Sequence, residues 1–133
     1  MNIELTGAAI PRLTRRDIVS FARKVLLELR QDIGVSIAFV DDETMIDLNR
    51  RFRHKSRTTD VLTFPGDELY SGEIIICVDQ ARRQAADEKH SIATEVRYLI
   101  LHGILHSLGY DHESDHGEMN ALELKLRSAV GLE

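Results

Sequence analysis

Three histidines in the C-terminal half of the chain are spaced like the ligands of a metal site. His102 and His106 are four residues apart on a predicted helix, so their side chains share one face and can reach one ion. Gly109 allows the chain to leave that helix and turn back, which lets His112 approach the same point. Zinc with three protein ligands keeps a fourth position for water, whose pKa falls to about 7. The sequence therefore predicts one catalytic zinc ion, or a similar divalent metal, per chain.

The same spacing occurs in the metzincin proteases, in which a glutamate after the first histidine serves as the general base. Here Gly103 takes that position, and no acid lies within the helical stretch from His102 to Leu108. The chain thus has the metal ligands and lacks the protease base. A metal hydrolase of another substrate, a peptide or a small molecule, stays open as an alternative. The metal also stays open, because three imidazoles suit nickel, copper and cobalt as well.

A basic segment near the middle of the chain is the second candidate for chemistry. Residues 50–57 carry five formal positive charges and no acid: Arg50, Arg51, Arg53, Lys55 and Arg57. Such a run is either a solvated face or an anion-binding surface. The net charge of −5 argues weakly against nucleic acid, but binding depends on where the charge sits. A local site for a polyanion is therefore compatible with an acidic protein.

Helices and strands that carry these residues are predicted from apolar periodicity, helix caps and glycines. Strands are expected at residues 2–6, 35–40, 61–64 and 72–78. Helices are expected from Thr14 to about Arg30, from a cap at Asp41 or Asp42 into the basic segment, from a cap at Asp79 through Ala86, from Ile92 to Leu108, and from about Ser114 to Val130. This order predicts an α+β fold, with about four strands in one small mixed sheet packed with helices. The metal site is expected at the end of a helix in the C-terminal half.

Length and composition limit the class of protein. A chain of 133 residues fits one domain, 1–133, which needs no disulfide or structural metal to fold. Hydrophobic residues make up 43% and charged residues 29%, as in an ordinary globular protein. Cys77 is the one cysteine, the first residues have no leader-like pattern, and no apolar run reaches membrane-spanning length. We therefore expect a cytoplasmic protein that does not contact membranes.

The window from His102 to His112 closely resembles the signature of the YbeY family, bacterial metal-dependent endoribonucleases linked to ribosomal RNA maturation. The family pattern His-Gly-x-Leu-His-x-x-Gly-Tyr-Asp-His is matched at every specified position. Two further blocks are similar to family motifs: Leu48–Arg53 followed by Thr59–Pro65, and Gly72–Cys77. Together the blocks cover roughly residues 35 to 130, most of the chain.

Two departures from the family pattern are small. Thr63 stands where serine is common, and Glu73 stands where the family usually has aspartate. Neither departure changes one of the three histidines. The role of Glu73 stays open.

The resemblance implies a fold, a site and a function. His102, His106 and His112 would be the zinc ligands, Arg53 the functional arginine, and the metal would lie in a cleft near the strand at 61–64. The implied activity is cleavage of single-stranded RNA in ribosomal RNA processing, including 3′-end maturation of 16S rRNA and ribosome quality control. It would take place in the bacterial cytoplasm, with ribosomal proteins as candidate partners. The oligomeric state is not implied.

Roles for the remaining candidates combine this resemblance with their chemistry. We hypothesise that Arg53 grips the scissile phosphate, since guanidinium forms paired hydrogen bonds to phosphate, while Arg50, Arg51, Lys55 and Arg57 follow the RNA backbone. Asp111 is either an acceptor that orients a ligand imidazole or an acid that caps a turn. The nucleophile is either water activated at the metal or the 2′-hydroxyl of the RNA. A ribosome-associated binding factor with a structural metal is the alternative to an enzyme.

Overall fold

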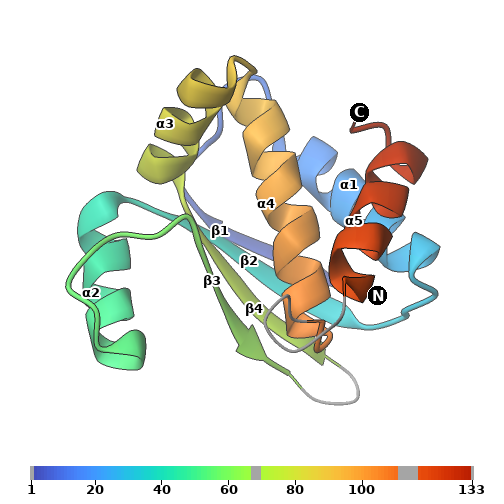
Figure 1. Cartoon of the computed structure of the whole chain (residues 1–133), viewed down its shortest axis with the longest axis horizontal. Coiled ribbons are helices and arrows are strands. Elements are labelled where there is room, and N and C mark those ends of the chain that lie inside the picture. Colours follow the sequence, from blue (N-terminus) through green and yellow to red (C-terminus); the bar gives the residue numbers. More distant parts are fainter. Residues whose placement is uncertain (1, 67–69, 111–116, 133) are drawn as a thin grey trace.

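The four expected strands form one mixed sheet in the computed structural model, which describes residues 2–66, 70–110 and 117–132 (Figure 1). The strands are β1 (Ile3–Gly7), β2 (Gly34–Val40), β3 (Val61–Pro65) and β4 (Tyr70–Cys77). Their order is β1-β2-β4-β3, with β1 parallel to β2, β2 parallel to β4, and β3 antiparallel to β4. The predicted α+β class with a four-stranded mixed sheet is confirmed. The order, which periodicity did not predict, puts β3 at an edge of the sheet.

Five helices are seen in the described part of the chain. They are α1 (Arg15–Glu28), α2 (Asp42–Arg53), α3 (Val78–Glu88), α4 (Ile92–Ser107) and α5 (Glu118–Ala129). The last one follows Gly117, which has a left-handed conformation at φ 101°, and the expected start near Ser114 lies outside the described residues. None of these helices is long and apolar enough to cross a membrane.

The caps explain where most of these helices begin. Thr14 and Asp17 form a full capping box on α1, with both hydrogen bonds at 3.0 Å. Asp41 caps α2 and Ser91 caps α4, as expected. The expected cap at Asp79 is wrong: Cys77 precedes α3, and the Asp79 carboxylate accepts the backbone N–H of Asp42 at 2.9 Å. Asp79 therefore ties α3 to the first turn of α2.

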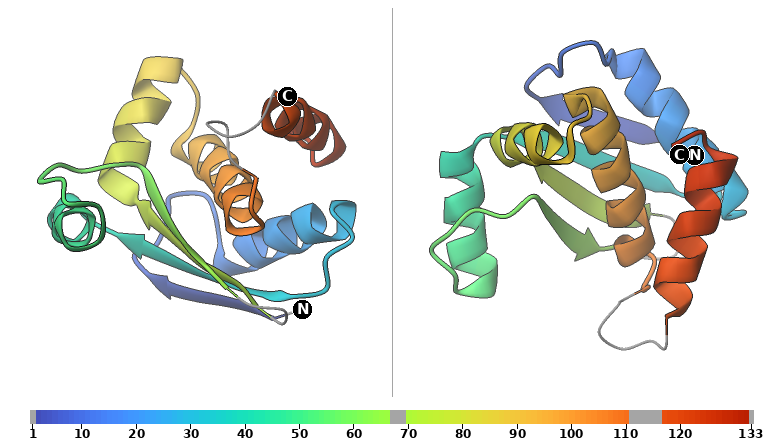
Figure 2. Two further views of the ribbon diagram at one scale, coloured as in Figure 1. Left: turned by 60° about the horizontal axis from the view of Figure 1, so that its bottom comes forward. Right: turned by 45° about the horizontal axis from the view of Figure 1, so that its top comes forward.

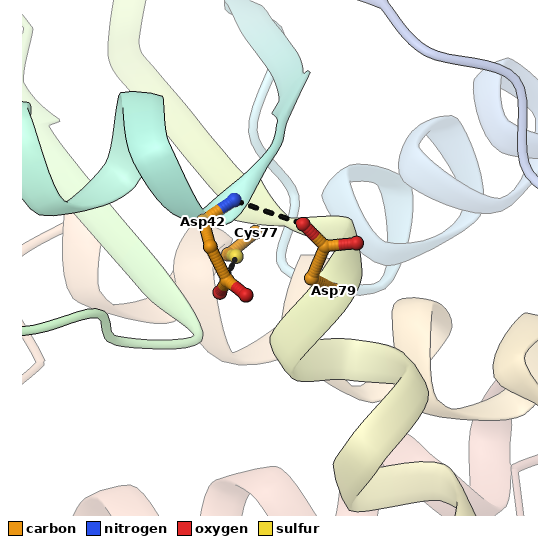
Figure 3. Close-up of side chains that lie close together, drawn as sticks. All are labelled: Asp42, Cys77 and Asp79. Carbon is orange, nitrogen blue, oxygen red and sulfur yellow. Dashed lines mark hydrogen bonds between the residues drawn. The ribbon is translucent and has the colours of Figure 1, made fainter.

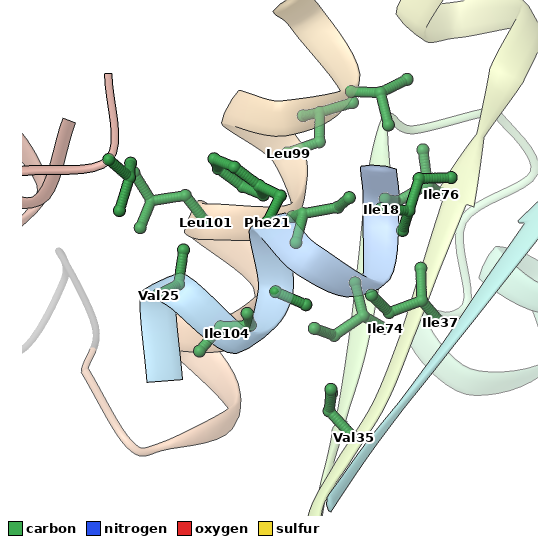
Figure 4. Packing of buried hydrophobic residues seen from close by; sticks show 14 of the residues in the cluster. Ile18, Phe21, Val25, Val35, Ile37, Ile74, Ile76, Leu99, Leu101 and Ile104 are labelled. Carbon is green, nitrogen blue, oxygen red and sulfur yellow. The ribbon is translucent and has the colours of Figure 1, made fainter. Parts of the chain in front are cut away.

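The helices lie in layers on the sheet. Both α1 and α4 pack on one face, and α5 packs on α1 and α4 away from the sheet (Figure 2). The main core lies between these layers, with side chains from α1, β2, β4 and α4 in contact (Figure 4). On the opposite face, α2 buries Met45 against Leu62 and Cys77. Successive strand residues point to opposite faces, which is why β3 and β4 supply both clusters.

Helix α4 is the element that carries the histidines, and it is buried on several sides. It contacts the sheet through β3 and β4, and it also contacts α1, α3 and α5. Its buried residues are therefore not confined to one stripe: Ala93, Glu95, Val96, Leu99, Ile100, Leu101, Gly103, Ile104 and Leu105. A helix held from so many directions presents its polar side chains in a fixed orientation.

Candidate active-site cleft

His102 and His106 lie one turn apart near the C-terminal end of α4, and both are half-buried. Their Nε2 atoms are 3.0 Å apart, and the two rings meet at 67° with centroids 4.4 Å apart. Two imidazole ligands of one tetrahedral zinc, each about 2.0–2.1 Å from the ion, would have nitrogens about 3.3 Å apart. The observed separation is within a few tenths of an ångström of that value. The pair therefore fits two positions of a divalent metal site.

The end of α4 matches the predicted turn. Gly109 has φ +99°. Its N–H donates to the carbonyl of His106, and the N–H of Tyr110 donates to the carbonyl of Leu105. This is the Schellman arrangement, which a glycine adopts at little cost. The predicted third ligand, His112, and Asp111 lie outside the described residues. Their roles stay predictions.

Arg53 is the last residue of α2, where basic side chains also interact favourably with the helix dipole. His54 follows in the left-handed conformation, at φ 56°, and the chain turns back from the helix. The buried side chain of Asn49 donates a 2.8 Å hydrogen bond to the carbonyl of Arg57, which holds the returning loop against α2. A local hydrogen bond thus fixes the direction in which the basic segment leaves the helix.

All five cations of the basic segment are exposed: Arg50, Arg51, Arg53, Lys55 and Arg57. Arg51 forms an ion pair with Asp47 one turn earlier, at 3.2 Å. Exposed pairs of this kind contribute little and exchange readily with another anion. The segment is therefore a solvent-facing basic surface at the C-terminal end of α2.

One cleft of about 430 Å³ brings the two candidate regions together. It is lined by Arg53, by residues 59–63 and by His102 and His106. The edge strand β3 runs between the arginine on one side and α4 on the other. A cation that can pair with phosphate therefore faces the same hollow as two potential metal ligands.

Asp60 adds a carboxylate to this cleft, which the sequence reasoning did not single out. One of its oxygens accepts the N–H of Val61 at 2.8 Å, and the other accepts the Gln84 amide at 3.3 Å. The Gln84 amide also donates to buried Glu95, which contacts His90 at 2.7 Å. A polar network therefore connects the cleft with the α3–α4 interface. The only local signal was the Thr-Asp pair before an apolar strand.

Glu123 of α5 is a second residue that the sequence reasoning missed. It is buried, and its Oε1 lies 3.4 Å from Nδ1 of His102. It occupies the apolar stripe of its helix, in line with buried Met119 and Leu126. An acid in such a stripe was the available signal, since a buried carboxylate requires a partner.

Glu73, whose role stayed open in the sequence, is exposed on β4. In the sheet register it lies between Ser36 of β2 and Phe64 of β3. It extends from the surface of the sheet.

A different group of potential ligands lies where α2, β4 and α3 meet. One atom each of Asp42, Cys77 and Asp79 lies within 4.8 Å of the others (Figure 3). Asp42, however, accepts two hydrogen bonds from Arg83, at 2.7 and 2.9 Å, which lower its pKa to about 2. Burial raises the pKa of the Cys77 thiol, which donates to Asp42 at 3.3 Å. The group can hold a cation only by giving up these bonds, so it fits an ion-paired junction better than a metal site.

A larger hollow of about 720 Å³ lies between β1 and α1. Its lining combines aliphatic side chains with Arg15, Arg16, Arg23 and Lys24. It lacks imidazole and carboxylate groups among its described lining residues. Metal chemistry is therefore better supported at the cleft by α4.

Comparison with known proteins identifies the family of the chain. The family model described as Endoribonuclease YbeY matches residues 7–131. An endoribonuclease YbeY of Nautilia profundicola is 41% identical over 110 residues, covering 80% of this chain and 79% of the relative. One of Solibacter usitatus is 40% identical over 120 residues, covering 90% and 82%. The solution structure of TM1509 from Thermotoga maritima is similar with a TM-score of 0.73 at 29% identity, covering 96% of this chain and 88% of that chain. The chain therefore belongs to the YbeY endoribonuclease family.

Proposed function

We propose that this protein is a metal-dependent endoribonuclease that cleaves single-stranded RNA during ribosomal RNA processing. The observation that carries the proposal is the single cleft that contains Arg53, His102 and His106. The names of the relatives, Endoribonuclease YbeY, support the reaction class. Within the bacterial cytoplasm, 3′-end maturation of 16S rRNA and ribosome quality control are the proposed processes, with ribosomal proteins as candidate partners.

One divalent ion would be held by His102, His106 and His112. Imidazole nitrogens suit zinc, and three of them leave a coordination position for water or substrate. When bound, the ion supplies Lewis-acid stabilisation of phosphate oxygens and lowers the pKa of a water in the cleft. The protein would contribute the orientation of the imidazoles, and α4 holds those of His102 and His106 through its packing on the sheet.

Arg53 would bind the phosphate that is cleaved. Arg53 lines the same cleft as the two histidines, and its guanidinium can make paired, charge-assisted hydrogen bonds to non-bridging oxygens. The exposed cations Arg50, Arg51, Lys55 and Arg57 would follow the neighbouring backbone phosphates. Charge concentrated on this one surface lets a chain of net charge −5 bind a polyanion.

The proposal is tested by cleavage of a structured ribosomal RNA fragment with single-stranded regions, using protein whose metal content is measured. His102→Ala is expected to lose bound metal and cleavage together. Arg53→Ala should keep its metal and lose about 100-fold or more in rate, as other groups that stabilise transition-state charge do. Arg23→Ala removes an exposed arginine of α1 outside the cleft and serves as the matched control. Equal cutting by all four proteins would indicate a contaminating nuclease and contradict the proposal.

Removal of the metal separates an enzyme from a binding factor with a structural metal. The main core is built from apolar side chains of α1, α4, α5 and the sheet, so the fold should persist without metal. We expect chelation to abolish cleavage while far-ultraviolet circular dichroism and the urea midpoint change little. Unfolding on chelation, with no cleavage by the metal-loaded protein, would favour the binding factor.

The products identify the nucleophile. A 2′,3′-cyclic phosphate end requires attack by the 2′-hydroxyl of the RNA itself. A 5′-phosphate or a linear 3′-phosphate formed without that intermediate requires attack by water. Mass spectrometry of the ends, on a substrate with a single 2′-deoxy nucleotide at the cut, separates the two.

A further inference from the structure

The buried acid Glu123 is in contact with one of the cleft histidines. It lies on α5 and is 6% exposed, and its Oε1 is 3.4 Å from Nδ1 of His102. The two residues are 21 positions apart and belong to different helices, so only the packing of α5 on α4 brings them together. This contact forms on the side of the imidazole away from His106, whose Nε2 faces Nε2 of His102.

The carboxylate is held in place by groups that do not belong to the cleft. Nη2 of Arg127, one turn later on α5, lies 3.7 Å from the same Oε1. The Arg127 guanidinium in turn stacks on the Tyr98 ring of α4, at 4.6 Å from its centroid. The Tyr98 hydroxyl donates to the carbonyl of Leu132 at 2.6 Å. Glu123 is therefore oriented by both helices before any ligand arrives.

A hydrogen-bond acceptor beside Nδ1 determines whether Nε2 carries a proton or a free lone pair. A neutral imidazole carries one proton, and a carboxylate beside Nδ1 favours the tautomer with that proton on Nδ1. Nε2 then presents a lone pair. In metal sites, such a carboxylate behind a ligand histidine fixes both the tautomer and the ring orientation.

We propose that Glu123 is a positioning residue of the metal site, which accepts a hydrogen bond from Nδ1 of His102 and directs Nε2 toward the ion. This inference rests on the proposed metal-dependent function, and it extends that function to a residue of α5. Arg127 keeps the carboxylate aimed at the ring. The packing of α5 on α4 thereby becomes part of the metal site.

The test measures zinc affinity by competition with a chromogenic chelator for wild type, Glu123→Gln and Glu123→Ala. Loss of a group behind a metal ligand typically weakens affinity by about 10- to 100-fold. We expect that range for Glu123→Ala and a smaller loss for Glu123→Gln, which keeps an oxygen acceptor without the charge. Leu124→Ala changes the adjacent, exposed residue of α5 and should bind zinc like wild type.

A second readout does not depend on metal or on activity. Nitrogen-15 spectra of the imidazoles in metal-free wild type should show His102 with its proton on Nδ1, and Glu123→Ala should lose that preference. Both readouts require a folded protein. If Glu123→Ala does not fold, the near-isosteric Glu123→Gln and the wild-type tautomer decide the matter.

Two failures can be told apart. If wild type does not bind about one zinc ion per chain, and His102→Ala has the same zinc content, the proposed metal site is wrong. The proposed function then fails with it. If wild type binds zinc and Glu123→Gln and Glu123→Ala bind it equally well, the positioning role is overturned and the metal site stands. A wild-type His102 with its proton on Nε2 would also overturn the positioning role.

Discussion

Gly103 packs directly against the buried side chain of Ile74, and a Cβ at position 103 would lie 2.7 Å from Cγ2 of that isoleucine. Position 103 therefore faces β4 and the core, while His102 before it faces the cleft. A glutamate there, as in the metzincin pattern, would point into the apolar core instead of toward a metal-bound substrate. The missing protease base thus has a packing reason in this fold.

This contact predicts that Gly103→Ala destabilises the protein. Overpacking a core costs about 1–3 kcal/mol, and the higher helix propensity of alanine offsets up to about 1 kcal/mol of it. We expect the free energy of unfolding to fall by about 1–2 kcal/mol, measured from the urea midpoint at an unchanged slope. In an Ile74→Ala background, Gly103→Ala should lower the free energy of unfolding by less, because Cγ2 of Ile74, which the new Cβ would meet, is absent. Equal costs in both backgrounds would contradict this explanation.

The ion pair between Asp42 and Arg83 predicts a pH-dependent contribution to stability. Hydrogen bonds from Arg83 lower the pKa of Asp42 from 3.8 to about 2 in the folded protein. The stabilisation is therefore fully present above pH 4 and is lost as the pH falls through about 2. Asp42→Asn should cost about 1 kcal/mol at pH 7 after solvent screening, and the difference from wild type should shrink steadily as the pH falls from 4 toward 2.

Thermal unfolding of both proteins from pH 7 to pH 2 measures that difference. Asp47→Asn provides the matched control, because Asp47 pairs with Arg51 on an exposed helix surface. Such surface pairs typically contribute less than about 0.5 kcal/mol. A constant difference between wild type and Asp42→Asn across the whole range would show that the ion pair is not its source.

The basic segment predicts how RNA binding depends on salt. Each phosphate contact on a single strand contributes roughly 0.7 to the slope of log K against log salt concentration. Lys55→Ala and Arg57→Ala, each made in a His102→Ala background that does not cut, should each reduce the magnitude of the slope by about that amount. Fluorescence anisotropy with a single-stranded oligonucleotide gives the slope, and Arg23→Ala is the control. Unchanged slopes would identify the segment as a solvated face.

Local residue patterns were sufficient to predict the elements whose signals lie within a few residues. The capping box of Thr14 and Asp17 starts α1, and Gly109 ends α4 in the predicted left-handed conformation. The spacing of His102 and His106 was enough to put both imidazoles on one helical face. These features depend on hydrogen bonds and periodicity that span at most about one turn of helix, so local residue types specify them.

Contacts between residues far apart in the sequence became visible only in the folded protein. The Asp79 carboxylate binds the first turn of α2 instead of capping its own helix, because α3 begins directly after β4 and its first turn lies beside Asp42. Arg53 lines the same cleft as the histidines because β3 pairs antiparallel with β4 at the edge of the sheet beside α4. Glu123 meets His102 because α5 packs on α4 through its apolar stripe. Such contacts depend on how whole apolar surfaces cover one another, which no local stretch of sequence encodes.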